Sequence, residues 1–208
     1  VCSSDLINKA ALTATGNSTS VTYNGANQTV SGFTVSGLQG SDTVASLSSV
    51  AASGATGKNA GSYTSTVTAG TETNYTVSTV NGGLTIAKAN ATVTANSGTL
   101  TYNGANQTVS GFTASGLVGG ETASGLSGVT ASRTEKNAGT YATTASGTDG
   151  NYNLSFVDGS MRINKAALTA TGNSTSVTYN GANQTVSGFT VSGLQDRKST
   201  RLNSSHLG

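Results

Sequence analysis

The chain has 208 residues, of which 9% are charged and 5% aromatic, and it contains 28 glycines but no proline and no tryptophan. Its formal net charge of +2, spread over few charged residues, argues against an electrostatic surface for nucleic acid or for an anionic membrane. No apolar run is long enough to cross a bilayer as a helix.

Both ends of the chain read as translated DNA adapter instead of protein. Eleven consecutive codons near the C-terminus resemble a widely used short-read sequencing adapter, and almost six at the N-terminus look like its reverse complement. We therefore interpret residues 1–6 and 196–208 as adapter artefacts and expect the fold to lie within residues 7–195. Removing the ends removes the only cysteine, Cys2, and the only histidine, His206, and leaves seven basic and six acidic residues.

One eleven-residue segment, Tyr-Asn-Gly-Ala-Asn-Gln-Thr-Val-Ser-Gly-Phe, occurs at residues 23–33, 102–112 and 179–189. Its spacing of 79 and then 77 residues predicts tandem modules. Residues 7–39 and 163–195 are identical, which a recent duplication, a collapsed tandem array or a circular assembly overlap would each explain. The native number of repeats therefore stays open.

The predicted modules cover residues 7–87 and 88–165, followed by a truncated third at residues 166–195. Short alternating runs with frequent turn signals and no helical stripe indicate an all-β fold of small antiparallel β-sandwich-like modules. A parallel β-helix is disfavoured because the period shows no subdivision into coils of about 20 residues. We expect an elongated array in which neighbour contacts matter, because only 17 of residues 7–85 are large and apolar. The third module should be only partly sheeted.

Turn signals mark two hairpins in each module. In the first, residues 20–23 and 28–35 flank Asn24-Gly25, a strong hairpin signal in which glycine takes a positive φ. Near the module end, residues 74–80 and 84–86 flank an Asn-Gly-Gly turn, and the second copy has the same arrangement. We predict that this closing hairpin leads into the next module without a flexible linker.

Gly-x-Tyr occurs at Gly61/Tyr63 and again at Gly139/Tyr141. This pattern is typical of a tyrosine corner, in which a hydroxyl ties down a crossing connection. We expect a structural role for both tyrosines.

The repeated motifs resemble the MBG and YDG repeat domains of large secreted bacterial proteins, including filamentous-haemagglutinin-like adhesins. The resemblance rests on the Tyr-Asn-Gly segment, on Lys-Asn-Ala-Gly-Ser-Tyr at residues 58–63 with residues 74–77, and on the closing segments at residues 80–86 and 157–163. Asparagine stands where the YDG pattern prefers aspartate, at positions 24, 103 and 180. The resemblance implies an extracellular, adhesin-associated role and supplies no catalytic residues.

Three tyrosines, Tyr23, Tyr102 and Tyr179, are the candidate ligand contacts, because aromatic faces are the usual platform for sugar rings. Each stands two residues after an apolar residue, so the same pattern favours core or edge packing. We predict no catalytic, cofactor-binding or metal-binding residues. Each module has about one carboxylate where calcium would need several, and it has neither histidine nor cysteine to activate a nucleophile.

We therefore expect no enzyme, but a structural repeat or stalk segment of a bacterial cell-surface or secreted adhesin that projects a distal binding region. Its expected partners are neighbouring repeats of the same chain. Two alternatives stay open. The first is that the repeats themselves bind a host glycan or protein weakly and gain avidity from repetition. The second is that the repeats pair homotypically through sheet edges in cell–cell or biofilm association.

Overall fold

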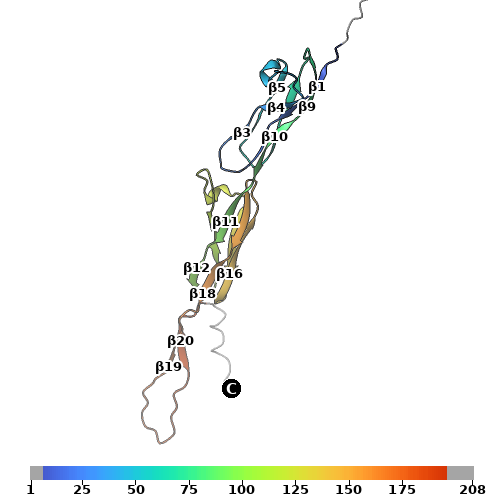
Figure 1. Cartoon of the computed structure of the whole chain (residues 1–208). Coiled ribbons are helices and arrows are strands. Elements are labelled where there is room, and N and C mark those ends of the chain that lie inside the picture. The colour runs from blue at the N-terminus through green and yellow to red at the C-terminus, as the bar shows by residue number, and fades with distance from the viewer. Residues whose placement is uncertain (1–6, 196–208) are drawn as a thin grey trace, which may run out of the picture. The chain divides into compact units, whose positions relative to one another are not determined.

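The computed structural model describes residues 7–195, drawn in colour in Figure 1. The segments interpreted as adapter, residues 1–6 and 196–208, lie outside the described residues. Within residues 7–195 every regular element is a strand except two 3₁₀-helices of three residues each, which confirms the all-β prediction. The described residues divide into two compact units, one of residues 7–92, 114–129 and 147–155 and one of residues 93–113, 130–146 and 156–195.

The first unit contains the complete first repeat. Its elements are β1 (Ala10–Gly16), β2 (Ser18–Thr22), β3 (Gln28–Val30), β4 (Phe33–Ser36), the 3₁₀-helix η1 (Val44–Ser46), β5 (Val50–Ala52), β6 (Ala55–Gly57), β7 (Gly61–Ser65), β8 (Val67–Ala69), β9 (Tyr75–Val80) and β10 (Gly82–Ala87). They form two three-stranded sheets, ordered β4-β1-β9 and β2-β10-β7, and two strand pairs, β3-β6 and β5-β8.

The second repeat has the same strand order with longer strands. Its elements are β11 (Ala89–Ala95), β12 (Gly98–Thr101), β13 (Gln107–Ser110), β14 (Phe112–Ser115), the 3₁₀-helix η2 (Ala123–Gly125), β15 (Val129–Glu135), β16 (Gly139–Gly147), β17 (Tyr152–Val157) and β18 (Gly159–Asn164). The orders β14-β11-β17 and β12-β18-β16-β15-β13 correspond to the sheets of the first repeat. The first repeat has one extra residue, Gly54, between β5 and β6. The second lacks it, so β15 runs unbroken.

Two extended segments of the first repeat cross side by side from one sheet to the other. β1 continues into β2 through Asn17, and β9 continues into β10 through Asn81. β9 runs parallel to β1, and β10 runs parallel to β2. A Cβ on Gly16 would lie 2.6 Å from the amide nitrogen of Gly82, so glycine is required where the two backbones approach this closely.

The hairpins predicted at Asn24-Gly25 and at the closing turns are wrong. β2 and β3, on either side of the first turn, pair with β10 and β6 and not with each other. β9 and β10 lie in different sheets, as do β17 and β18. The last strand of the repeat takes the place beside β2, so long-range pairing outweighs the local turn signal. The sheets are therefore mixed, with parallel as well as antiparallel pairs.

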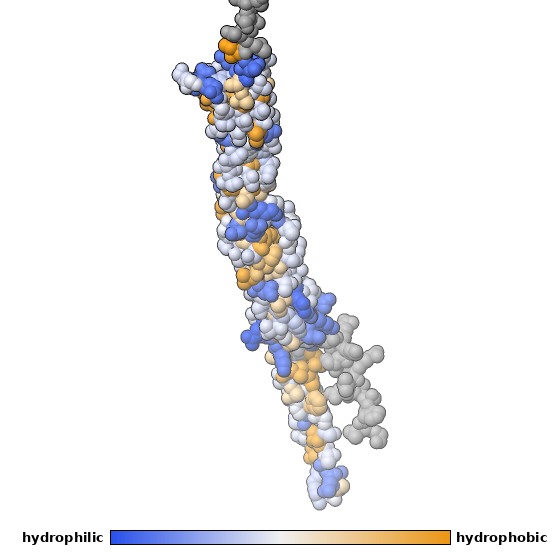
Figure 2. All heavy atoms as spheres, turned by 45° about the vertical axis from the view of Figure 1, so that its right-hand side comes forward, coloured by the Kyte–Doolittle hydropathy of each residue, from blue (hydrophilic) through white to orange (hydrophobic). Residues whose placement is uncertain are grey.

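The core of the first repeat follows the two-residue period of its strands. Alternate residues of β1 face inward, and Leu12 and Ala14 are 1% and 0% exposed. One cluster of buried residues consists of Leu12, Ala14, Leu47, Val50, Val67 and Tyr75. Pale, weakly polar residues dominate the face seen in Figure 2, with hydrophobic residues scattered among them, as expected for a surface rich in serine, threonine and glycine.

The third repeat is only partly sheeted, as predicted. Its strands are β19 (Thr169–Gly172) and β20 (Phe189–Ser192), which pair antiparallel as β1 and β4 do. Residues 163–195 contain no counterpart of β9 or β10, so nothing covers this strand pair from within its own repeat. Leu168 and Phe189 are accordingly 59% and 50% exposed.

One buried polar position recurs in both complete repeats. Ser65 and Thr143 occupy equivalent places in β7 and β16, and each is 0% exposed. Neither hydroxyl has a hydrogen-bond partner among the described residues. A buried hydroxyl without a partner loses its hydration without compensation, which costs free energy of folding.

Replacing Thr143 by valine keeps the shape of the side chain and removes the hydroxyl. We expect Thr143→Val to raise the free energy of unfolding by about 1 kcal/mol in chemical denaturation. The control is Thr144→Val in the same strand, where an exposed side chain should change stability by less than about 0.5 kcal/mol. A loss of stability in Thr143→Val would mean that the hydroxyl makes a favourable bond.

Candidate functional site

The three candidate tyrosines occupy three different environments. Tyr23 is 3% exposed, so neither face of its ring is free for a ligand. Tyr102 is half-buried and packs against the cluster of Val109, Met161 and Ile163. Tyr179, in the partly sheeted third repeat, is 89% exposed. Ligand contact at these positions stays a prediction.

The turn that follows each of these tyrosines is built in the same way. The side-chain oxygen of Asn24 accepts a hydrogen bond from the amide of Ala26 at 2.9 Å, and Asn103 and Asn180 do the same in their repeats. The glycines after them have φ of 78°, 77° and 75°. The Asn-Gly pairs therefore form the tight turn with positive φ that the sequence predicts.

Tyr23 meets the second repeat through a carboxylate. Its hydroxyl donates a hydrogen bond to Glu121 Oε1, and the hydroxyl of Tyr152 donates to Oε2 of the same side chain at 2.7 Å. The amide of Val118 in turn donates to the Tyr152 hydroxyl at 3.0 Å. The rings of Tyr23 and Tyr152 meet edge to face, with centroids 5.4 Å apart and an angle of 84° between planes. One carboxylate thus joins a tyrosine from each repeat.

The pKa values follow from this sharing. Hydrogen bonds from Tyr23 and then Tyr152 lower the pKa of Glu121, and the charge of Lys58 lowers it further against the effect of burial. The hydrogen bond to Glu121, together with burial, raises the pKa of Tyr23 to about 12. Burial and then the bond to Glu121 raise the pKa of Tyr152. At neutral pH the site holds one carboxylate and two neutral hydroxyls.

A second contact lies beside the first. The amide of Ala60 donates to Asn151 Oδ1 at 2.9 Å, and Asn151 Nδ2 donates to Asn59 Oδ1 at 3.3 Å. On the first repeat, the hydroxyl of Tyr63 holds this loop by donating to the carbonyl of Asn59 at 2.9 Å, which confirms the predicted tyrosine corner. On the second, Asp149 accepts from the amide of Asn151 at 2.7 Å.

The backbones also approach closely. A Cβ on Gly25 would lie 2.8 Å from the Cα of Gly119, so a larger residue at position 25 would push the two loops apart. We call Tyr23, Gly25 and Ala60 the plug of the first repeat. We call Val118, Glu121, Asn151 and Tyr152 the socket of the second. All seven residues belong to the first compact unit.

Within residues 7–195, no group of three or more histidines, cysteines, aspartates or glutamates is placed to hold a metal ion. The described part of the chain has no helix long and apolar enough to cross a membrane.

Comparison with known families agrees with the two complete repeats. The model of the MBG domain (YGX type) family matches residues 12–85 and again residues 91–162. The chain belongs to this family. The resemblance inferred from the repeated motifs is thereby confirmed, and residues 12–85 and 91–162 are tandem MBG repeats. No curated protein and no solved structure matches it.

Sequence reasoning missed the acid on which the plug and socket depend. An acid stands at the same position of both complete MBG repeats, Asp42 three residues after Gln39 and Glu121 three residues after Val118. The tyrosines they bind, Tyr75 and Tyr152, also correspond. The sequence signal that could have revealed this site is an acid and a tyrosine that recur at equivalent positions of both repeats. It is missed when the sequence is searched only for pairs of carboxylates, because each repeat contributes a single acid.

Removing the shared hydrogen bond should weaken the contact between the MBG repeats. We expect Tyr23→Phe to lower the free energy of unfolding by about 1 kcal/mol, because Glu121 is partly hydrated and its bond is worth less than a fully buried one. In a Glu121→Ala background the same change should cost almost nothing. Tyr179→Phe, at an exposed position, is the control. Equal costs in both backgrounds would contradict the bond.

The same contact should depend on pH at both ends of the scale. The pKa of Glu121 is lowered from 4.5, so its contribution is complete above about pH 5 and is lost as the pH falls through the lowered value. The pKa of Tyr23 is raised from 10.0 to about 12, so its contribution is complete below pH 10 and is lost between pH 10 and 12. The stability difference between the wild type and Tyr23→Phe should therefore peak between about pH 5 and 10. A difference independent of pH would contradict this.

Proposed function

We propose that this chain is a spacer in the repeat region of a bacterial secreted or cell-surface adhesin. The observation that carries the proposal is the plug of the first repeat seated in the socket of the second through Glu121. A spacer must keep a distal part of the protein at a distance, and this requires junctions that resist bending. The extracellular location rests on the family resemblance.

The covalent link between the repeats is short. β10 ends at Ala87 and β11 begins at Ala89, so Lys88 alone separates the last strand of one repeat from the first strand of the next. Lys88 Nζ donates to the carbonyl of Asp149 at 2.7 Å, which holds the link against the second repeat. A short link keeps the plug at a high effective concentration beside the socket, so hydrogen bonds that are weak singly can hold the junction.

We also propose that the chain is not an enzyme. Four of the six acids within residues 7–195 accept hydrogen bonds from tyrosine, serine or the backbone. Glu72 accepts from the amide and the hydroxyl of Ser49 at 2.8 and 2.6 Å, and these bonds lower its pKa. Asp42 and Glu121 accept from tyrosine hydroxyls, and Asp149 accepts from backbone amides. Acids engaged in this way suit a structural role better than proton transfer.

The stiffness of the junction can be measured with spin labels. With Cys2→Ser removing the single cysteine of the sequence, labels on Thr29→Cys and Ser155→Cys of the full chain report the distance between two exposed strand positions, one in each repeat. Double electron–electron resonance should give one narrow distribution. Glu121→Ala combined with Asn151→Ala should broaden it severalfold.

The matched control is Asp158→Ala, which removes an exposed acid from the second repeat outside the socket. A distribution that is already broad in the wild type would defeat the spacer proposal. A glycan array probed with the full chain tests the main alternative. Specific binding that is lost in Tyr179→Ala would assign the function to ligand recognition by the repeats themselves.

A further inference from the structure

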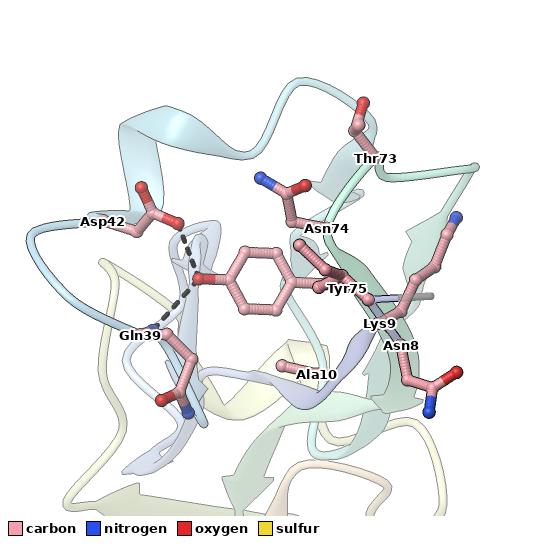
Figure 3. Close-up of a pocket in the computed structure, with 9 residues that line it drawn as sticks. Asn8, Lys9, Ala10, Gln39, Asp42, Thr73, Asn74 and Tyr75 are labelled. Carbon is pink, nitrogen blue, oxygen red and sulfur yellow. Dashed lines mark hydrogen bonds between the residues drawn. The ribbon is translucent and has the colours of Figure 1, made fainter. Parts of the chain in front are cut away.

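The first repeat carries a socket of its own, in which no plug from residues 7–195 is seated; we call it the open socket. It consists of Gln39, Asp42, Asn74 and Tyr75, the residues that correspond to Val118, Glu121, Asn151 and Tyr152. Figure 3 shows the Tyr75 hydroxyl reaching Asp42 and the backbone of Gln39. These residues line a pocket of about 350 Å³.

The internal bonds of the two sockets agree closely. The hydroxyl of Tyr75 donates to Asp42 Oδ2 at 2.6 Å, and the amide of Gln39 donates to that hydroxyl at 3.0 Å. The corresponding distances in the second repeat are 2.7 and 3.0 Å. Lys9 Nζ donates to the carbonyl of Glu72 at 2.6 Å, as Lys88 does to that of Asp149. The open socket is therefore already in the geometry of the occupied one.

Three features of the open socket correspond to contacts that a plug makes in the occupied one. Asn74 is exposed and its side chain has no hydrogen bond among the described residues, whereas Asn151 accepts from Ala60. A Cβ on Gly40 would meet nothing within 4 Å, whereas its counterpart Gly119 faces the plug.

The third feature is an apolar side chain at the edge of the pocket. Ile7 is 91% exposed, whereas its counterparts Ile86 and Ile163 are each 2% exposed. Those two isoleucines are buried within the repeat that precedes them in the chain, on β10 and β18. A whole repeat docked at this pocket would supply the same apolar surroundings to Ile7, which a small ligand would not.

We propose that the socket formed by Gln39, Asp42, Asn74 and Tyr75 binds the plug end of another MBG repeat of this kind. The occupant contributes the tyrosine of its Tyr-Asn-Gly segment to Asp42 and the amide after its Lys-Asn pair to Asn74. This docking follows the geometry at Glu121 and does not require that the repeats act as a spacer.

The second repeat presents a plug end built like that of the first. The amide of Tyr102 donates to the carbonyl of Asn164 at 2.9 Å, as Tyr23 does to Ala87 at 2.8 Å. The hydroxyl of Tyr141 holds the carbonyl of Asn137 at 3.1 Å, as in the tyrosine corner of the first repeat. Each complete repeat therefore carries both a socket and a plug, so the contact can propagate head to tail.

The test inserts an additional copy of residues 7–85 directly ahead of Ile7 in the full chain. Tyrosines labelled with ¹³C at Cζ are titrated by NMR and assigned by single Tyr→Phe changes. The added tyrosine at the Tyr23 position should titrate with a raised pKa and remain largely protonated at pH 11, and the same result is expected for Tyr23. Asp42→Ala in the original first repeat should return the added tyrosine to a pKa near 10 and also lower the raised pKa of Tyr75, which shares Asp42, while Tyr23 stays unchanged. Glu121→Ala should in turn affect Tyr23 and Tyr152 and leave the added tyrosine unchanged, which makes the two variants matched controls.

An added tyrosine that titrates near pH 10 while Tyr23 stays protonated would overturn the proposal. A second measurement covers the other half of the contact. The added copy's amide at the Ala60 position should exchange with solvent at a rate similar to that of Ala60, and Asn74→Ala should speed its exchange at least tenfold. Unchanged exchange in Asn74→Ala, or an added copy that fails to fold beside an intact socket, would also count against the proposal.

Discussion

A carboxylate that accepts hydrogen bonds from tyrosine hydroxyls is the interaction on which both the end of each repeat and the contact between repeats depend. Within a repeat, the Tyr152–Glu121 bond ties the loop after β14 to the first residue of β17. Because a carboxylate has two oxygens, Glu121 keeps one acceptor for Tyr23. The internal bond thus positions the acid for the external one, and little additional ordering is needed when the repeats meet.

The fold explains why a repeat of this composition needs all of its residues. Its first and last strands lie side by side and run parallel, β1 with β9 and β2 with β10. The sheets therefore remain incomplete until the last strands are present, and most contacts join residues far apart in sequence. The third repeat illustrates the consequence, because β19 and β20 pair while their apolar residues stay exposed. The core is small, so each repeat also gains from its neighbour.

Strand positions, turn residues and repeat period could be predicted because they depend on local patterns. The alternation in β1, the Asn24-Gly25 turn and the hydroxyl of Tyr63 follow from sequence spacing alone. Strand pairing could not be predicted in this way. The short-range signal at Asn24 favours a hairpin, whereas the structure places β10 beside β2 through a crossing of Gly16 and Gly82 that only the folded backbone reveals.

Only part of the candidate site could be predicted from the sequence. Alternation with apolar residues already favoured packing over ligand contact for Tyr23, and the structure buries it. The same residue type in the same motif is half-buried at Tyr102, which packs against the closing strand of its own repeat, and exposed at Tyr179, where residues 163–195 contain no such strand. Identical local sequence cannot encode that difference. Glu121 was missed for a related reason, since its partner Tyr23 lies 98 residues away.

A polar socket also removes a constraint that many repeat proteins face. Arrays that stack through apolar surfaces need capping repeats, because an unpaired end would expose that surface to water. In the first repeat the Tyr75 hydroxyl already donates to Asp42, so an open socket leaves this hydroxyl satisfied. Asp42 and Asn74 are exposed, so both side chains can bind water until a docking plug displaces that water. The free-energy difference between an open and an occupied socket is therefore small per junction, and docking gains its strength from the short covalent link through Lys88 and its equivalents.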